Sequence, residues 1–245
     1  MIVFLAALLP AVVLMLYIIW RDRKRPEPTS QLLKGFGYGI ASVFVSLSVT
    51  MPAMELGFIP DTSTTPLQAL YEAFGGAAIP EESAKLFMLW LLLKKNPYFD
   101  EYFDGVVYAV SVGLGFAAFE NVTYLFGADD GEWMSLAIVR GLLSVPAHYF
   151  FAVLMGYYYS LVHFGHNSWH NRMMVWVAPV VAHGIFDALL MVGAVEEVSG
   201  LVQSILFIGL LGFSVQLRKL CQRHIETLLQ NDDNYSRYEG HYREP

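Results

Sequence analysis

The chain has 245 residues, of which 56% are hydrophobic and only 15% are charged, with a formal net charge of −7. Soluble domains carry roughly a quarter charged residues, so this composition excludes an ordinary soluble protein and indicates a polytopic membrane protein. The single cysteine, Cys221, excludes an internal disulfide framework and a zinc site built from cysteines. The basic residues lie in short loops instead of gathering on one face, so nucleic acid is not an expected partner.

Seven segments are long and apolar enough to cross a bilayer as helices: residues 2–20, 36–58, 67–93, 104–126, 134–162, 173–194 and 199–217. The first lacks the basic start of a secretory signal, so we expect it to be retained as a helix. In the third, Gly75, Gly76 and Pro80 predict a broken or re-entrant helix that lines a cavity. The sequence therefore predicts an all-α bundle of about seven transmembrane helices with a polar cavity inside the bilayer.

Loop charges predict the orientation of the bundle. Basic residues occupy the first loop, residues 94–95, residue 172 and residues 218–223, whereas the alternate loops 59–66, 127–133 and 196–199 contain no Lys or Arg. The positive-inside rule then places the N-terminus outside and the C-terminus in the cytoplasm. We expect two helices with a basic cytoplasmic loop in 1–65, the core with the polar motifs in 66–194, the last helix with its basic end in 195–229, and a flexible, polar cytoplasmic tail in 230–245.

Charged side chains within the spans are candidate functional residues, because each costs on the order of 2.5–3.5 kcal/mol near the bilayer centre. They are Glu81, Glu82 and Lys85 on the third span, Glu120 on the fourth, Arg140 and His148 on the fifth, and His183 and Asp187 on the sixth. Depths counted along each helix place them in the middle and outer half of the membrane. We therefore expect four helices to bring them together in one polar cavity.

Helical spacing places some of these residues on common faces, since residues four apart are neighbours. The pairs are Glu81 with Lys85, Phe116 with Glu120, and His183 with Asp187. Lys85 is expected to neutralise a glutamate, and Arg140 to act as counter-ion to Glu120 or Glu82. Structural interpretations remain open, because Pro80 followed by two acids is also an ordinary helix start. A hydrogen bond between His183 and Asp187 can likewise simply hold the bundle together.

Acids and histidines inside a bilayer serve two main chemistries. One is a proton or ion relay, as in a proton-coupled transporter or channel. The other is hydrolysis by water that a carboxylate activates, with His or Asp stabilising the oxyanion. The sequence lacks HExxH, GxSxG and GxGD motifs, which leaves glutamate as the base. A transporter predicts inverted repeats and a charged path to both faces, and the sequence shows neither, which favours hydrolysis.

Four polar motifs follow one another on successive spans. They are "IPEESAKL" (79–86), "DGVVYAVSVGLGFAAFENVTYLF" (104–126), "VRGLLSVPAHYFFAVLMGYYY" (139–159) and "HGIFDALL" (183–190). With their EExxK, FxxxE and HxxxD patterns, they resemble the PrsW family of intramembrane proteases, part of a larger group with the CAAX prenyl endopeptidases. The likeness is close over about residues 66–194.

This resemblance implies a glutamic or metal-dependent intramembrane protease in a bacterial plasma or inner membrane. Its substrates would be single-span membrane proteins, such as an anti-sigma factor cut at its first site. The implied catalytic residues are Glu81, Glu82, Glu120, His148, His183 and Asp187, with Lys85, Arg140, Phe116 and Asn121 in support. Glu81 or Glu82 would activate water, while His183 and Asp187 polarise the scissile carbonyl. No cofactor is expected to be obligatory; a zinc ion, if one takes part, would be held by Glu120, His148 and His183.

Overall fold

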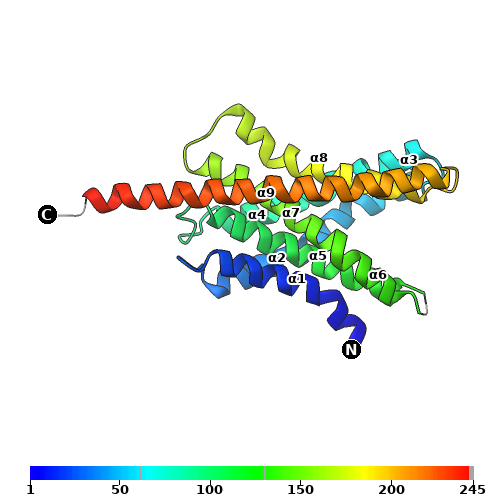
Figure 1. Ribbon diagram of the computed structural model, residues 1–245, viewed down its shortest axis with the longest axis horizontal. Helices are drawn as coiled ribbons and strands as arrows, with labels where there is room; N and C mark the ends of the chain where they lie inside the picture. Colours follow the sequence, from blue (N-terminus) through cyan, green and yellow to red (C-terminus); the bar gives the residue numbers. More distant parts are fainter. Residues whose placement is uncertain (61, 130, 243–245) are drawn as a thin grey trace.

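The computed structural model describes residues 1–60, 62–129 and 131–242, and in them every regular element is a helix. The α-helices are α1 (Ile2–Arg21), α2 (Thr29–Glu55), α3 (Pro66–Tyr71), α4 (Ile79–Leu93), α5 (Asp104–Gly127), α6 (Trp133–Val139), α7 (Val145–His163), α8 (Trp169–Ala194) and α9 (Gly200–Tyr242). Two π-helices, η1 (Glu72–Ala78) and η2 (Arg140–Ser144), join α3 to α4 and α6 to α7. The long helices run roughly along the long axis of the molecule (Figure 1). The predicted all-α bundle is confirmed.

The seven predicted segments correspond to seven continuous helical stretches. Among the described residues, six of these are long and apolar enough to cross a membrane: α1, α2, α5, α6 through α7, α8, and α9 as far as Asn234. The remaining stretch, α3–η1–α4, is helical throughout but carries Glu72, Glu81, Glu82 and Lys85. The predicted orientation in the membrane stays a prediction.

Two predicted boundaries were wrong. The second helix begins at Thr29 instead of residue 36. The chain from Gln230, expected to be a flexible tail, continues α9 as far as Tyr242, and this end projects beyond the rest of the bundle (Figure 1). Asp232 helps to hold α9 there, because its carboxylate accepts hydrogen bonds from the amides of Tyr102 at 2.7 Å and Phe103 at 3.0 Å. Residues 243–245 lie outside the described residues.

Helix α5 forms the centre of the bundle and packs against α1, α2 and α7. The α2 and α5 backbones touch, because a Cβ atom on Gly39 would collide with the Val112 carbonyl and one on Gly115 with the Phe36 carbonyl. Close backbone approach through small residues is a main source of helix association in lipid, where the hydrophobic effect between helices is absent. The contact fixes the part of α5 that leads directly to the polar motif around Glu120.

Both π-helices lie just before prolines, Pro80 in α4 and Pro146 in α7. Proline has no amide hydrogen and its ring clashes with the carbonyl four residues earlier, so a wider π turn relieves the conflict. For Pro80 that carbonyl belongs to Gly76, and the Thr50 hydroxyl on α2 lies 3.4 Å from it as a donor. The predicted break in the third segment is therefore a π-helix within a continuous helical stretch.

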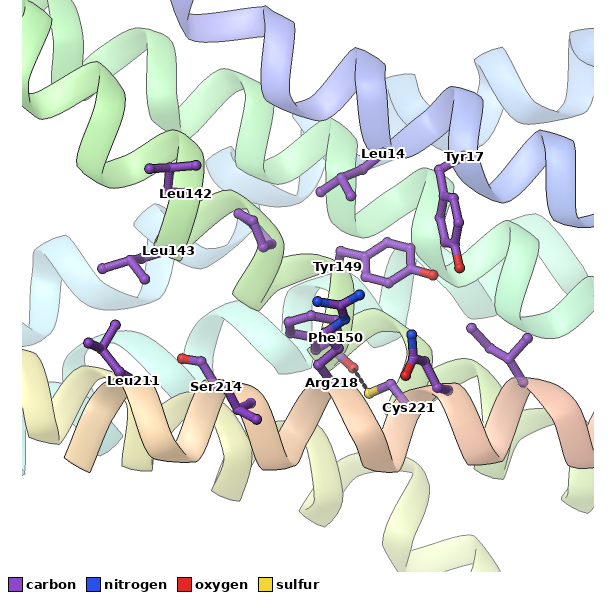
Figure 2. Close-up of a pocket in the computed structure, with 14 residues that line it drawn as sticks. Leu14, Tyr17, Leu142, Leu143, Tyr149, Phe150, Leu211, Ser214, Arg218 and Cys221 are labelled. Atoms are coloured by element: carbon purple, nitrogen blue, oxygen red, sulfur yellow. Dashed lines mark hydrogen bonds between the residues drawn. The ribbon is translucent and has the colours of Figure 1, made fainter. Parts of the chain in front are cut away.

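A cavity of about 490 Å³ lies between α1, η2–α7 and α9 (Figure 2). Apolar side chains such as Leu14, Leu142 and Leu211 line much of it, and the Cys221 thiol on α9 donates to the Phe150 carbonyl. The described residues that line this cavity include no acid and no histidine. It therefore lacks the groups that hydrolysis requires, and the polar motifs lie around a different cavity.

Candidate active site

A polar cavity of about 310 Å³ lies among η1–α4, α5, α6–η2–α7 and α8. Its charged and imidazole lining consists of Glu81, Glu120, Arg140, His148, His183 and Asp187. Side chains close to helix ends, including Tyr124, Leu136 and Met191, also line it, so the cavity lies toward the loops at 128–132 and 195–199. The predicted meeting of polar groups from four helices is therefore present.

Lys85 lies among these groups at the start of α4. Its Nζ is 2.8 Å from Glu82 Oε1, 3.3 Å from Glu81 Oε2 and 3.1 Å from His148 Nδ1. The ammonium also lies 3.9 Å from the ring centroid of Phe116, which explains the aromatic residue of the FxxxE motif. Burial of a charge costs heavily unless it is paired and hydrogen-bonded, and Lys85 is both. The expected neutralising role of Lys85 agrees with this geometry.

The hydrogen bonds assign the protons of the two histidines. An ammonium only donates, so His148 accepts at Nδ1 and carries its proton on Nε2, which donates to Glu120 Oε2 at 3.0 Å. His183 instead faces carboxylate oxygens on both sides, with Nδ1 2.9 Å from Glu82 Oε1 and Nε2 3.1 Å from Asp187 Oδ2. A ring that donates from both nitrogens is an imidazolium, so His183 adds a positive charge to the site.

Glu120 is held by Arg140, which is the expected counter-ion. The Arg140 guanidinium donates through Nη2 to Glu120 Oε2 at 2.7 Å and through Nε to Asn121 Oδ1 at 2.9 Å. Asn121 in turn donates through Nδ2 to the carbonyl of Ala7 at 2.8 Å. Since Ala7 lies on α1, this chain of hydrogen bonds links the first helix to the cavity.

Two aromatic residues at the site were not identified from the sequence. The Tyr124 ring lies 3.8 Å from the Arg140 guanidinium carbon, and Phe151 stacks on His183 with ring centroids 4.7 Å apart. Helical spacing contained a signal for both, because Tyr124 is four residues after Glu120 and Phe151 three residues after His148. In a chain with 17 phenylalanines and 14 tyrosines, that signal does not distinguish them from ordinary core residues.

The two adjacent glutamates differ in their surroundings. Glu82 is fully buried and makes the short contacts to Lys85 and His183, while its Oε2 has no hydrogen-bond partner among the described residues. Glu81 lines the cavity and makes longer contacts, 3.3 Å to Lys85 Nζ and 3.9 Å to His183 Nε2. Four carboxylates here face three cations, and Glu81 is the most loosely held. It is therefore the carboxylate best placed to take a proton from water.

The residues also fit a metal ion by number and chemistry. Glu81, Glu82, His148 and His183 each offer a ligand atom, and these atoms lie within 4.8 Å of one another. Carboxylates and neutral imidazoles are zinc ligands, so His183 would have to lose one of its two protons before it could hold a metal. The set shares His148 and His183 with the expected trio and has Glu81 and Glu82 in place of Glu120, which Arg140 and the His148 Nε2 proton engage. Lys85 contacts three of the four residues, so its ammonium provides a positive charge where a metal would.

Comparison with known proteins identifies the family of the chain. The family described as PrsW family intramembrane metalloprotease matches residues 27–213, which include all four motifs. Curated relatives named Protease PrsW include those of Clostridioides difficile (strain 630), 33% identical over 192 residues, and Geobacillus kaustophilus (strain HTA426), 33% identical over 189 residues. The relative from Bacillus subtilis (strain 168) is 30% identical over 187 residues.

The alignments cover 77%, 76% and 76% of this chain and 79%, 78% and 81% of these relatives, in the same order. No solved structure matches the chain. With the family matched over most of the chain and the motifs gathered around one cavity, the chain belongs to the PrsW family and is a multi-pass membrane protease.

Proposed function

We propose that this protease is an endopeptidase that cuts single-span membrane proteins, such as an anti-sigma factor, with water activated by Glu81. The observation that carries the proposal is the contrast between the two glutamates. Glu81 faces the cavity and is loosely held, whereas Glu82 is sealed between Lys85 and His183. The position of the cavity inside the bundle supports a substrate whose scissile bond lies in or next to its membrane span.

In the proposed reaction, Glu81 takes a proton from water as the water oxygen attacks the scissile carbonyl carbon. The positive charge of His183, held in place by Glu82 and Asp187, stabilises the oxyanion that forms. Glu120, fixed by Arg140 and His148, helps to orient the water. When the C–N bond breaks, Glu81 passes the proton to the leaving amine nitrogen, and the acyl carbon becomes a carboxylic acid.

A metal is not obligatory in this proposal, because Lys85, Arg140 and His183 already provide positive charge around the cavity. A zinc ion held by Glu81, Glu82, His148 and His183 would supply a Lewis acid that polarises the carbonyl. Glu81 and His183 take part in either chemistry, and only a metal-free reaction persists after zinc is removed.

The test is cleavage of an epitope-tagged single-span anti-sigma factor, co-expressed with the protease in a bacterial membrane. Glu81→Gln is expected to lower cleavage at least about 100-fold, since general-base catalysis contributes typically 10²–10⁴-fold. Glu72→Gln is the matched control. Glu72 lies in η1, and its carboxylate accepts a hydrogen bond from the Ser63 hydroxyl instead of lining the cavity. The unfolding temperature of each variant, measured in micelles, should match that of the wild type.

A folded Glu81→Gln variant that still cleaves would overturn the assignment of the base. A wild-type protease that leaves the anti-sigma factor intact but cuts other tagged single-span proteins would keep the chemistry and remove this substrate.

A further inference from the structure

At the end of the bundle opposite the cavity, three carboxylates gather from two different loops. Glu27 precedes α2, and Asp100 and Asp104 lie in the connection to α5 and at its first residue. One carboxylate oxygen from each lies within 4.8 Å of the other two. Asp104 is 1% exposed, Glu27 is half-buried and Asp100 is exposed, so the group runs from the protein interior to the surface.

Asp104 has one oxygen in use and one free. Its Oδ2 accepts hydrogen bonds from the backbone amides of Asp100 at 3.1 Å and Glu101 at 2.7 Å. Its Oδ1 is buried, and no donor within the described part of the chain reaches it. With Oδ2 turned to the amides, the second oxygen is the one available to the neighbouring carboxylates. A buried carboxylate oxygen without a donor is costly unless a cation or a proton meets it.

Among the described residues, no Lys or Arg side chain is paired with the Asp104 carboxylate. The nearby basic residues are engaged elsewhere, with Arg25 paired to Glu101 and Lys24 to Asp233 at 3.3 Å. In the described residues no ion pair joins a Lys or Arg to Glu27, Asp100 or Asp104. More negative charge lies next to the trio, because buried Asp22 accepts a hydrogen bond from the Glu27 amide at 3.0 Å.

We propose that Glu27, Asp100 and Asp104 bind a hard divalent cation, Mg²⁺ or Ca²⁺. All of the ligands are carboxylate oxygens, which these cations prefer. Oxygens bound at about 2.0–2.6 Å on opposite sides of one ion lie about 4–5 Å apart, which agrees with the observed spread. Asp100 at the surface provides the entry, and water completes the coordination. The cation ties the loop before α2 to the start of α5, the central helix.

This site is separate from the protease cavity, which it shares no residue with. Cation binding at the trio can therefore be measured through the stability of the protein, without any substrate. A negative result would leave the proposed peptidase activity untouched. The loop charges predict that this end of the bundle lies in the cytoplasm, which favours Mg²⁺ over Ca²⁺.

The experiment uses the full chain, purified in detergent micelles, stripped with EDTA and then titrated separately with MgCl₂ and CaCl₂ while its unfolding temperature is followed. At a cation concentration about 100 times the Kd, the wild-type unfolding temperature should rise by about 5–11 °C. Terbium(III), used as a Ca²⁺ probe, should also give emission sensitised by Tyr108, whose hydroxyl donates to Glu27.

Asp104→Asn and Glu27→Gln should abolish both responses. The Asn side chain can keep the two backbone hydrogen bonds through its oxygen and donate through its amide to Glu27, so Asp104→Asn is expected to fold. Asp233→Asn, an acid at the same end of the molecule but outside the trio, should respond like the wild type.

A rise with only one of the two cations supports the proposal and identifies the ion. If neither cation stabilises the wild type, or if all four proteins respond alike, the site does not exist and the trio shares protons instead.

Discussion

The Nζ of Lys85 lies 3.1 Å from Nδ1 of His148, although the two residues are 63 positions apart and lie on α4 and α7. The contact fixes the tautomer of His148 and thereby directs its Nε2 proton to Glu120. It also places a permanent cation beside both glutamates of the EExxK motif. Lys85 thus connects the two halves of the site, and its removal should affect both.

Lys85→Met should destabilise the protein by about 3–5 kcal/mol, because it removes one partner of a buried ion pair and leaves the fully buried Glu82 with His183 alone. Unfolding in micelles, followed by denaturant or heat, measures this loss. The double variant Lys85→Met with Glu82→Gln removes both charges and should recover much of the stability. Equal stability of the single and double variants would show that the Glu82 charge is not the source of the loss.

Cleavage should persist when the purified protease is treated with 1,10-phenanthroline, because resident side-chain cations occupy the place of a metal. Metal analysis of the treated protein establishes that zinc has been removed. This chelator is chosen over EDTA because EDTA would also strip the proposed Mg²⁺ or Ca²⁺ site. Loss of cleavage that zinc restores would instead make the metal obligatory, with Glu81, Glu82, His148 and His183 as its candidate ligands.

Asn121→Ala should lower kcat by about 100-fold, since small displacements of positioning groups have effects of this size. The substitution removes the acceptor for Arg140 Nε and the donor to the Ala7 carbonyl, so Arg140 and Glu120 lose their alignment. The cleavage assay measures kcat and KM separately, and the loss is expected in kcat. Thr123→Ala, an exposed position on the same helix, is the control. Equal kcat in Asn121→Ala and the control would remove Asn121 from the positioning network.

Gly39→Ala should destabilise the bundle by about 1–3 kcal/mol, because the added methyl group collides with the Val112 backbone and forces α2 away from α5. Gly37→Ala provides a matched control two residues earlier, where a Cβ atom meets nothing within 4 Å. The unfolding temperatures of the two variants in micelles give the comparison. If Gly39→Ala were as stable as Gly37→Ala, the direct backbone contact between the helices would be wrong.

Much of the fold follows from the sequence, because a bilayer imposes a simple rule. Backbone polar groups must be satisfied within each span, so an apolar run of sufficient length forms a helix. All seven helical stretches could therefore be predicted, whereas the start of α2 and the continuation of α9 could not. Polar flanks beyond the bilayer follow weaker local preferences, and tertiary contacts such as those of Asp232 decide them.

The candidate site divides in the same way. The free-energy cost of placing charged side chains in a bilayer identified which polar residues to consider. Spacing of four residues identified the Glu81–Lys85 and His183–Asp187 contacts that the structure contains. Which helix meets which is a matter of packing over long separations. For that reason the partners of His148, the link from Asn121 to α1 and the stacking of Phe151 required the tertiary structure.

The sequence by itself determined that this is a helical membrane protein with a buried acid–histidine motif of the PrsW type. Adjacent glutamates look equivalent in a sequence, because they differ only in the direction in which each leaves the helix. The tertiary structure directs Glu82 into the packed interior and Glu81 toward the cavity. It also gathers Glu27, Asp100 and Asp104 from two loops, a juxtaposition that no local pattern contains.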